Sequence, residues 1–143
     1  PAMYRKYFKP RHAKLFAAQK RLFPKPFYSF FHSDGAIRNI LPDFVEIGVD
    51  VLNPVQLTAA GMDAAELKQA FTGKLVFWGG GADTQGSLPH GTPDDVRRDV
   101  QNWMGDLRTS GGYIFGAVHN IQDDVSPENI LAMIEAFNEL RQY

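Results

Sequence analysis

Four short apolar runs recur along this sequence, at 27–31, 49–52, 74–78 and 113–115. Each is followed by a segment with the apolar spacing of an amphipathic helix. Short, continuously apolar runs are typical of strands covered on both faces, and strand–helix alternation is typical of parallel sheets. The pattern predicts an α/β fold of four βα units, preceded by a helix over about 4–22. Four units allow an open doubly wound sheet or half of a (β/α)8 barrel, which needs eight strands to close.

Three helix starts carry clear local signals. Asp63 is followed three residues later by a glutamate, and Thr92 and Ser126 each precede a proline at a first helical position. Side-chain oxygens at these positions accept hydrogen bonds from free amides of the first turn. We therefore predict that helices begin directly after Asp63, Thr92 and Ser126.

Length and composition narrow the class of protein. The chain has 143 residues and is 44% apolar, which is typical of one globular domain. No apolar run approaches the roughly 18 residues of a membrane span, and no signal-peptide pattern is present, so we expect a cytoplasmic protein that does not contact a membrane. The sequence contains no cysteine, which excludes thiolate nucleophiles and thiolate metal ligands from this chain.

The N-terminal arm, residues 1–26, is strongly basic. All eight of its lysines and arginines precede the first acidic residue, Asp34. A basic amphipathic arm can bind nucleic acid or an anionic surface. Charge runs more commonly form a solvated face or meet acidic groups of the same protein. We favour the second interpretation and do not expect nucleic acid as a partner.

Polar residues follow each apolar run, where parallel α/β folds collect their functional groups. The set comprises His32 and Asp34 after the first run, Asn53 and Gln56 after the second, Asp83 and Gln85 after the third, and His119 and Asn120 after the fourth. We predict one site at this end of the sheet, where the amides of the set bind a small-molecule substrate.

Two histidines and a carboxylate in this set have the composition of a metal site. His32, Asp34 and His119 would be its ligands. The alternative is that His32 forms a hydrogen bond within the site and Asp34 caps the following helix. The glycines at 79–81 match neither a dinucleotide-binding nor a P-loop spacing, and we expect Trp78 to lie in the core with the strand phenylalanines.

Several segments together resemble one known family. They are FHSDG at 31–35, ILPD at 40–43, GVDVLNPVQ at 48–56, SPENILAM at 126–133 and the early segment 4–10. With these segments the chain resembles the uroporphyrinogen decarboxylase superfamily. The resemblance implies a (β/α)8 barrel of which 1–143 is the C-terminal half, a single partial domain with arm 1–26 and four βα units over 27–143. The N-terminal half would lie outside this sequence and supply the remaining site residues.

One branch of that superfamily consists of decarboxylases that need no cofactor. They typically carry Gly-Asn-Leu-Asp-Pro after the third of these strands and Gly-His-Gly after the last. Asp83 and His119 match the aspartate and the histidine of these motifs approximately. The resemblance then implies decarboxylation of porphyrinogen-type carboxylate side chains. Asp83 would stabilise a cationic intermediate, and His119 would move protons.

The other branch consists of zinc-dependent methyltransferases that use a corrinoid on a partner protein. Their first strand typically ends in His-x-Cys-Gly, which His32 and Gly35 match, with Asp34 in the place of the cysteine. This implies zinc or another divalent metal held by His32, Asp34 and His119. We expect metal-assisted one-carbon transfer first and decarboxylation second.

Two further expectations concern the chain by itself. A non-catalytic module that binds an anion or a partner is the remaining alternative to an enzyme. A half-barrel alone should be inactive and should dimerise through its exposed strand edges.

Overall fold

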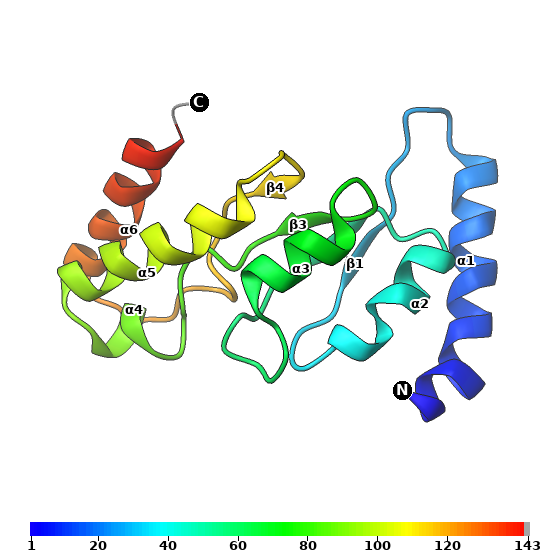
Figure 1. Cartoon of the computed structure of the whole chain (residues 1–143), viewed down its shortest axis with the longest axis horizontal. Helices are drawn as coiled ribbons and strands as arrows, with labels where there is room; N and C mark the ends of the chain where they lie inside the picture. The colour runs from blue at the N-terminus through cyan, green and yellow to red at the C-terminus, as the bar shows by residue number, and fades with distance from the viewer. Residues whose placement is uncertain (142–143) are drawn as a thin grey trace.

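The computed structural model describes residues 1–141. Its elements follow one another as η1 (Tyr4–Phe8), α1 (Lys9–Leu22), β1 (Phe30–His32), η2 (Arg38–Ile40), α2 (Leu41–Glu46), β2 (Val51–Asn53), α3 (Ala64–Phe71), β3 (Val76–Trp78), α4 (Ser87–His90), α5 (Pro93–Leu107), β4 (Tyr113–Ile114) and α6 (Pro127–Leu140). Strands and helices alternate after an initial basic helix (Figure 1), which confirms the predicted α/β class.

The four strands form one parallel sheet in the order β1-β2-β3-β4. Pairing runs from Phe30 opposite Val51, at the β1 edge, to Trp78 opposite Ile114, at the β4 edge. The strand order follows the chain order, as in a (β/α)8 barrel, whereas a doubly wound sheet reverses direction at a switch point. Of the two architectures that the sequence left open, the barrel-type order is the one present.

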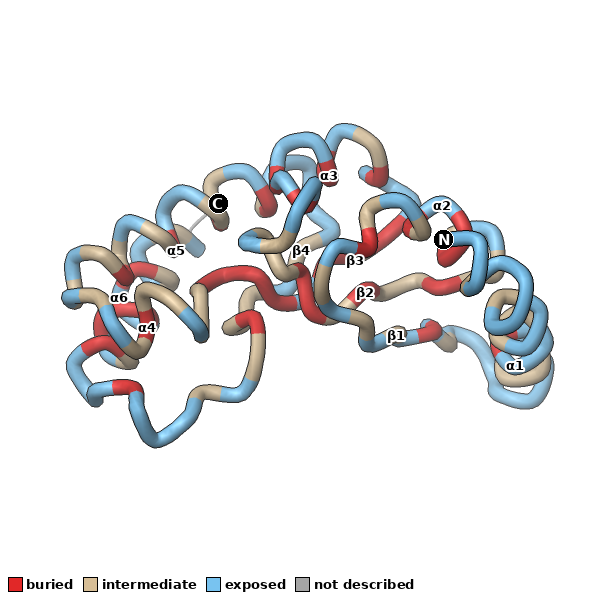
Figure 2. Tube along the Cα trace, turned by 90° about the horizontal axis from the view of Figure 1, so that it is seen from below, coloured by how far each residue is buried: buried red, intermediate tan, exposed pale blue. Residues whose placement is uncertain are grey.

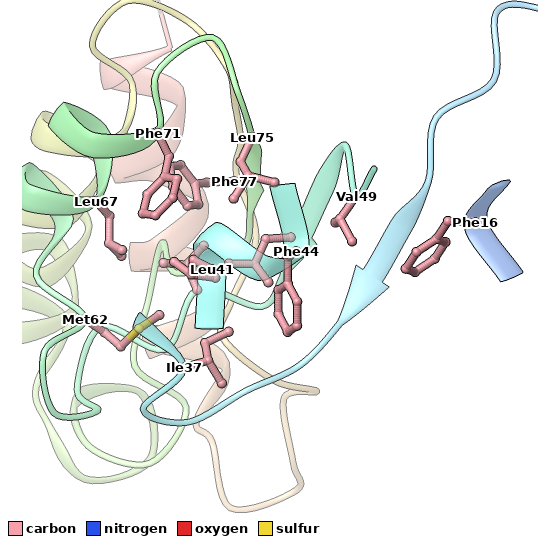
Figure 3. Close-up of a cluster of buried hydrophobic side chains, with 12 residues drawn as sticks. Phe16, Ile37, Leu41, Phe44, Val49, Met62, Leu67, Phe71, Leu75 and Phe77 are labelled. Atoms are coloured by element: carbon pink, nitrogen blue, oxygen red, sulfur yellow. The ribbon is translucent and has the colours of Figure 1, made fainter. Parts of the chain in front are cut away.

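Helices cover one face of this sheet. Leu52 of β2 and Phe77 of β3 are fully buried in a core that includes Phe44 of α2 and Leu67 of α3 (Figure 3). Phe77 is the buried residue of β3, and the stretch 79–82 that follows the strand is buried throughout (Figure 2).

The opposite face of the sheet is exposed in the described structure. Phe30 is 46% exposed, Trp78 41% and Ile114 40%. Alternate residues of a strand point to opposite faces, so these side chains project away from the helices. The expectations that the strands are covered on both faces and that Trp78 lies in the core are therefore wrong for residues 1–141. The strands carry apolar side chains on both faces, so the sequence pattern did not distinguish the covered face from the exposed one.

A second core lies between α5 and α6, at the end of the molecule away from α1 (Figure 1). Val96 and Val100 of α5 and Ala136 of α6 are fully buried there. An ion pair between Arg97 and Glu135, with 2.7 Å between Nη2 and Oε2, joins the two helices at the surface.

The predicted helix starts are confirmed. The Asp63 carboxylate accepts a hydrogen bond from the Glu66 amide at 2.9 Å, and the Ser126 hydroxyl accepts one from the amide three residues later. Thr92 and Asp95 form a reciprocal capping box, in which the Thr92 amide donates to the Asp95 carboxylate at 2.9 Å. These caps satisfy amides that have no partner within the helix.

The basic arm packs against acidic groups of the same chain. Arg5 Nε lies 2.9 Å from one carboxylate oxygen of Asp43, and Lys9 Nζ lies 2.7 Å from the other. Lys20 Nζ lies 2.9 Å from the Asp50 carboxylate. The favoured interpretation of the arm, that its charges meet acidic surface within the protein, agrees with these pairs. Within the described part of the chain, no helix has the length and apolar character needed to cross a membrane.

Candidate active site

Asn53 ties together the ends of three strands. Its Nδ2 donates to the backbone carbonyl of Trp78 at 3.1 Å, and its Oδ1 lies 2.8 Å from His32 Nδ1. The Trp78 carbonyl can only accept, which fixes the orientation of the Asn53 amide. His32 Nδ1 must then be a donor, so the neutral ring presents an unprotonated Nε2. The first two predicted strand ends therefore meet, and His32 has a defined tautomer.

The loops after β1 and β4 also meet. His119 Nε2 lies 3.8 Å from Asp34 Oδ2, although β1 and β4 are at opposite edges of the sheet. Three strand spacings in a flat sheet amount to about 14 Å, so the approach comes from the paths of the two loops over the sheet end. The His119 side chain is 28% exposed and Asp34 is 56% exposed. At 3.8 Å the two groups interact as a charge pair when His119 is protonated, rather than through a short hydrogen bond.

A hollow of about 400 Å³ opens beside these groups at the carboxyl ends of the strands. It is lined by His32, Asn53, Ala117, Val118, His119, Asn120 and Gln122. Its size suits a small ligand. Three of the four predicted strand ends contribute side chains to it. Sequence reasoning missed Gln122, which lies two residues beyond the last polar pair and carried no motif.

Two other predicted site residues support loops. Gln56 Oε1 accepts a hydrogen bond from the Gly35 amide at 2.9 Å and so holds the loop that carries Asp34. Asp83 Oδ1 accepts from the Gln85 amide at 2.9 Å within its own loop. Neither Asp83 nor Gln85 lines the hollow. The third strand end is thus organised around its own turn, whereas the other three face one another.

The predicted metal ligands do not assemble as a set of three. Within residues 1–141, no three histidine, aspartate or glutamate side chains are grouped so as to hold one ion. Asp34 and His119 form a pair, while His32 directs Nδ1 to Asn53. A catalytic zinc ion commonly has three protein ligands. The side chains of residues 1–141 alone do not fit such a centre. For His32, the structure instead shows the alternative that the sequence left open, a hydrogen bond within the site, here to Asn53.

Aromatic side chains adjoin the polar groups on the exposed face. His32 pairs with Asn53, and Trp78 pairs with Ile114, in the registers of the sheet. Phe30 packs edge to face against Trp78 with 5.3 Å between ring centroids. Period-two alternation along each strand places these rings on the same face as His32 and Asn53, and this signal was available in the sequence.

Comparison with known sequences identifies a family. The model of the family described as uroporphyrinogen decarboxylase (URO-D) matches residues 1–140. The chain belongs to the uroporphyrinogen decarboxylase family. It is also similar to a curated uroporphyrinogen decarboxylase of Pseudoalteromonas translucida (strain TAC 125), with 40% identity over 53 residues. That alignment covers 37% of this chain and 15% of the relative.

Membership of the uroporphyrinogen decarboxylase family gives the fold its context. The sequential parallel sheet is consistent with part of a (β/α)8 barrel. Active sites of such barrels lie at the carboxyl ends of the strands. The hollow bounded by His32 and His119 occupies that end.

Proposed function

We propose that this chain supplies part of the active site of a uroporphyrinogen decarboxylase-family enzyme that decarboxylates a porphyrinogen-type carboxylate substrate. The observation that carries the proposal is the approach of His119 to Asp34, 3.8 Å apart, beside the polar hollow. The family match and the printed name of the relative support the same reaction class.

The pair has the chemistry that decarboxylation requires. When the bond between the carboxylate carbon and its neighbour breaks, carbon dioxide leaves and the electron pair stays on the neighbouring carbon. That carbon must then take up a proton, which protonated His119 can donate. The carboxylate of Asp34 lies 3.8 Å from His119 Nε2, next to the proton to be transferred. Nε2 of His32 and the Asn120 side chain, on the wall of the hollow, are available to bind polar groups of the substrate.

In this proposal the carboxylate role moves within the predicted set. Sequence reasoning assigned the stabilisation of a cationic intermediate to Asp83. The Asp83 carboxylate instead accepts from the Gln85 amide, and it is Asp34 that pairs with His119. We therefore propose Asp34 as the carboxylate that acts beside His119, with Asp83 as a residue that shapes its loop.

Metal-assisted one-carbon transfer is the second candidate. One observation favours it, because two of the three predicted ligands, Asp34 and His119, are brought within 3.8 Å of each other. The predicted ligands His32, Asp34 and His119 would hold a metal only if they moved closer together; the metal would supply Lewis acidity, and a corrinoid protein would be a partner. Because the three predicted ligands are not grouped around one point in the described residues, we rank this reaction below decarboxylation.

Substitution of His119 tests the proposal in a complete enzyme that contains this chain. His119→Gln should lower kcat for release of carbon dioxide from a porphyrinogen carboxylate by about 10²- to 10⁴-fold, the usual contribution of a positioned general acid. Asp34→Asn should also lower kcat, because His119 loses the carboxylate that lies 3.8 Å from its Nε2. His90→Gln, on an exposed residue of α4, is the matched control and should leave kcat unchanged.

Elemental analysis of the same preparations separates the two candidates. Full turnover in His119→Gln would overturn the proposal. Stoichiometric metal that is lost in both His119→Gln and Asp34→Asn, together with methyl transfer from a corrinoid, would establish the second candidate instead.

A further inference from the structure

A second hollow of about 280 Å³ lies at the opposite end of the sheet, where the strands begin. Lys68, Lys74, Asp50 and the backbone of Gly111 and Gly112 are among the groups that line it. Its position, on the amino-end side of β2, β3 and β4, separates it from the candidate active site. Neither proposed reaction uses it.

Lys68 is the notable residue of this hollow. Its side chain belongs to α3, yet only 4% of the residue is exposed. Its ammonium group donates to the backbone carbonyl of Gly111, and it forms no ion pair with any residue in 1–141. Burial lowers the pKa of Lys68 below its ordinary value. An ammonium carries three N–H donors, so one carbonyl leaves a buried cation largely uncompensated.

The other charges at this hollow do not compensate Lys68. Asp50 is the acidic side chain on its wall, and its carboxylate already lies 2.9 Å from Lys20 Nζ and accepts from the Ser29 amide at 2.7 Å. Lys74 adds a further positive charge, with its Nζ 3.2 Å from the carbonyl of Ala70. The hollow therefore has an excess of positive charge.

Two glycines, Gly111 and Gly112, form part of the wall of the hollow next to Lys68. Ser110, Gly111 and Gly112 have φ values of 58°, 70° and 67°, in the left-handed region that favours glycine. A methyl group added to Gly112 would lie 4.0 Å from Lys68 Nζ. Glycine at this position thus leaves space beside the ammonium that a side chain would fill.

We propose that this hollow binds a small oxyanion, a phosphate or a carboxylate, with Lys68 as its charged ligand. The anion supplies the charge and the acceptors that Lys68 lacks within the described chain. Lys74 strengthens the attraction from the rim. The site is independent of the proposed function, because no group of the His119–Asp34 pair takes part in it.

Titration with inorganic phosphate at constant ionic strength tests this inference. Saturable chemical-shift changes are expected at the amides of Gly111 and Gly112, together with a rise in Tm, because the anion binds the folded state. Lys68→Met keeps the aliphatic length and removes the charge. It should weaken phosphate binding by at least about tenfold, the effect of losing one charge-assisted hydrogen bond. Lys14→Met, on an exposed residue of α1, is the matched control and should bind phosphate normally.

A second readout distinguishes a ligand from a purely structural lysine. If Lys68 serves as an anion ligand, Lys68→Met without phosphate should have an unchanged or higher Tm, because an uncompensated charge has left the interior. If Lys68 only holds the Gly111 carbonyl, Lys68→Met should have a lower Tm and phosphate should have no saturable effect on the parent chain. The latter result, or equal phosphate binding by Lys68→Met, would overturn the proposal.

Discussion

Asp43 shows how one buried carboxylate anchors the basic arm. The residue is 5% exposed, and its two oxygens receive Arg5 and Lys9. Burial by itself raises the pKa of Asp43. The hydrogen bonds and charges of Lys9 and Arg5 together lower the pKa by more than burial raises it, so the net shift is downward. A group whose pKa is lower in the folded state stabilises the fold above its unfolded pKa of about 3.9, and this stability is lost as the pH falls through the folded value.

We predict that Asp43→Asn lowers the free energy of unfolding at neutral pH by about 1–3 kcal/mol, because Arg5 and Lys9 lose the negative charge and one of the two acceptor oxygens that they share. In the parent chain, the contribution of Asp43 to stability falls as the pH drops below its unfolded pKa of about 3.9, and the variant should lose this part of the fall. Urea unfolding at a series of pH values measures both effects. Asp123→Asn, in an exposed loop, should match the parent chain. If stability fell with decreasing pH in Asp43→Asn as it does in the parent chain, Asp43 would not be the source of this fall.

At the scale of elements, the caps decide where helices begin and the apolar stripe decides what they cover. α5 starts at the capping box of Thr92 and Asp95 and buries Val96, Val100 and Met104 on one face. Both features are local in sequence, which is why the helix starts were predictable. The strands were less so. The run 27–31 was predicted as the first strand, whereas β1 is Phe30–His32. It starts three residues later than the apolar run, and it ends on a polar residue that an apolar pattern excludes.

The Thr92 cap should contribute measurably to stability. We predict that Thr92→Ala destabilises the chain by about 1 kcal/mol, since the Asp95 amide loses its acceptor and the box is broken. Thr58→Ala, in an exposed loop, is the control and should change stability by less than about 0.5 kcal/mol. Chemical denaturation followed by circular dichroism measures the difference. Equal midpoints for the two variants would show that the box carries no stability.

At the scale of the whole molecule, the sheet is an incomplete barrel wall in the described residues. Helices cover one face, while Phe30, Trp78 and Ile114 leave an apolar strip on the other. β1 and β4 are the two edge strands. We propose that the remaining strands of a (β/α)8 barrel cover this face in the complete enzyme, with this chain as its C-terminal half. An exposed apolar face with open strand edges favours association.

The chain by itself should therefore self-associate. We predict dimers or larger species in light scattering at micromolar concentration, and a shift toward monomer in Trp78→Lys, which places a charge on the apolar strip. Ile134→Lys, at a comparably exposed position on α6, is the matched control and should associate as the parent chain does. A stable, well-dispersed monomer of the parent chain would contradict this prediction.

The candidate site was predictable in composition and only partly in geometry. His32, Asn53, His119 and Asn120 follow apolar runs in the sequence, and these side chains do line one hollow. Asp83 carried the same signal, yet its carboxylate serves its own loop. The sequence pattern could not distinguish a residue that lines the hollow from one that bonds within its own loop. Both kinds of residue come directly after an apolar run, and only the path of the loop differs.

The sequence by itself determined the order of strands and helices, the helix starts and the polar character of the strand ends. These depend on hydrogen bonds and side-chain patterns over a few residues. Tertiary structure alone decided that Asp34 reaches His119 across the width of the sheet, that Asn53 fixes the tautomer of His32, and which sheet face is exposed. Such distances depend on how helices pack on the sheet and where loops return, which no short segment encodes.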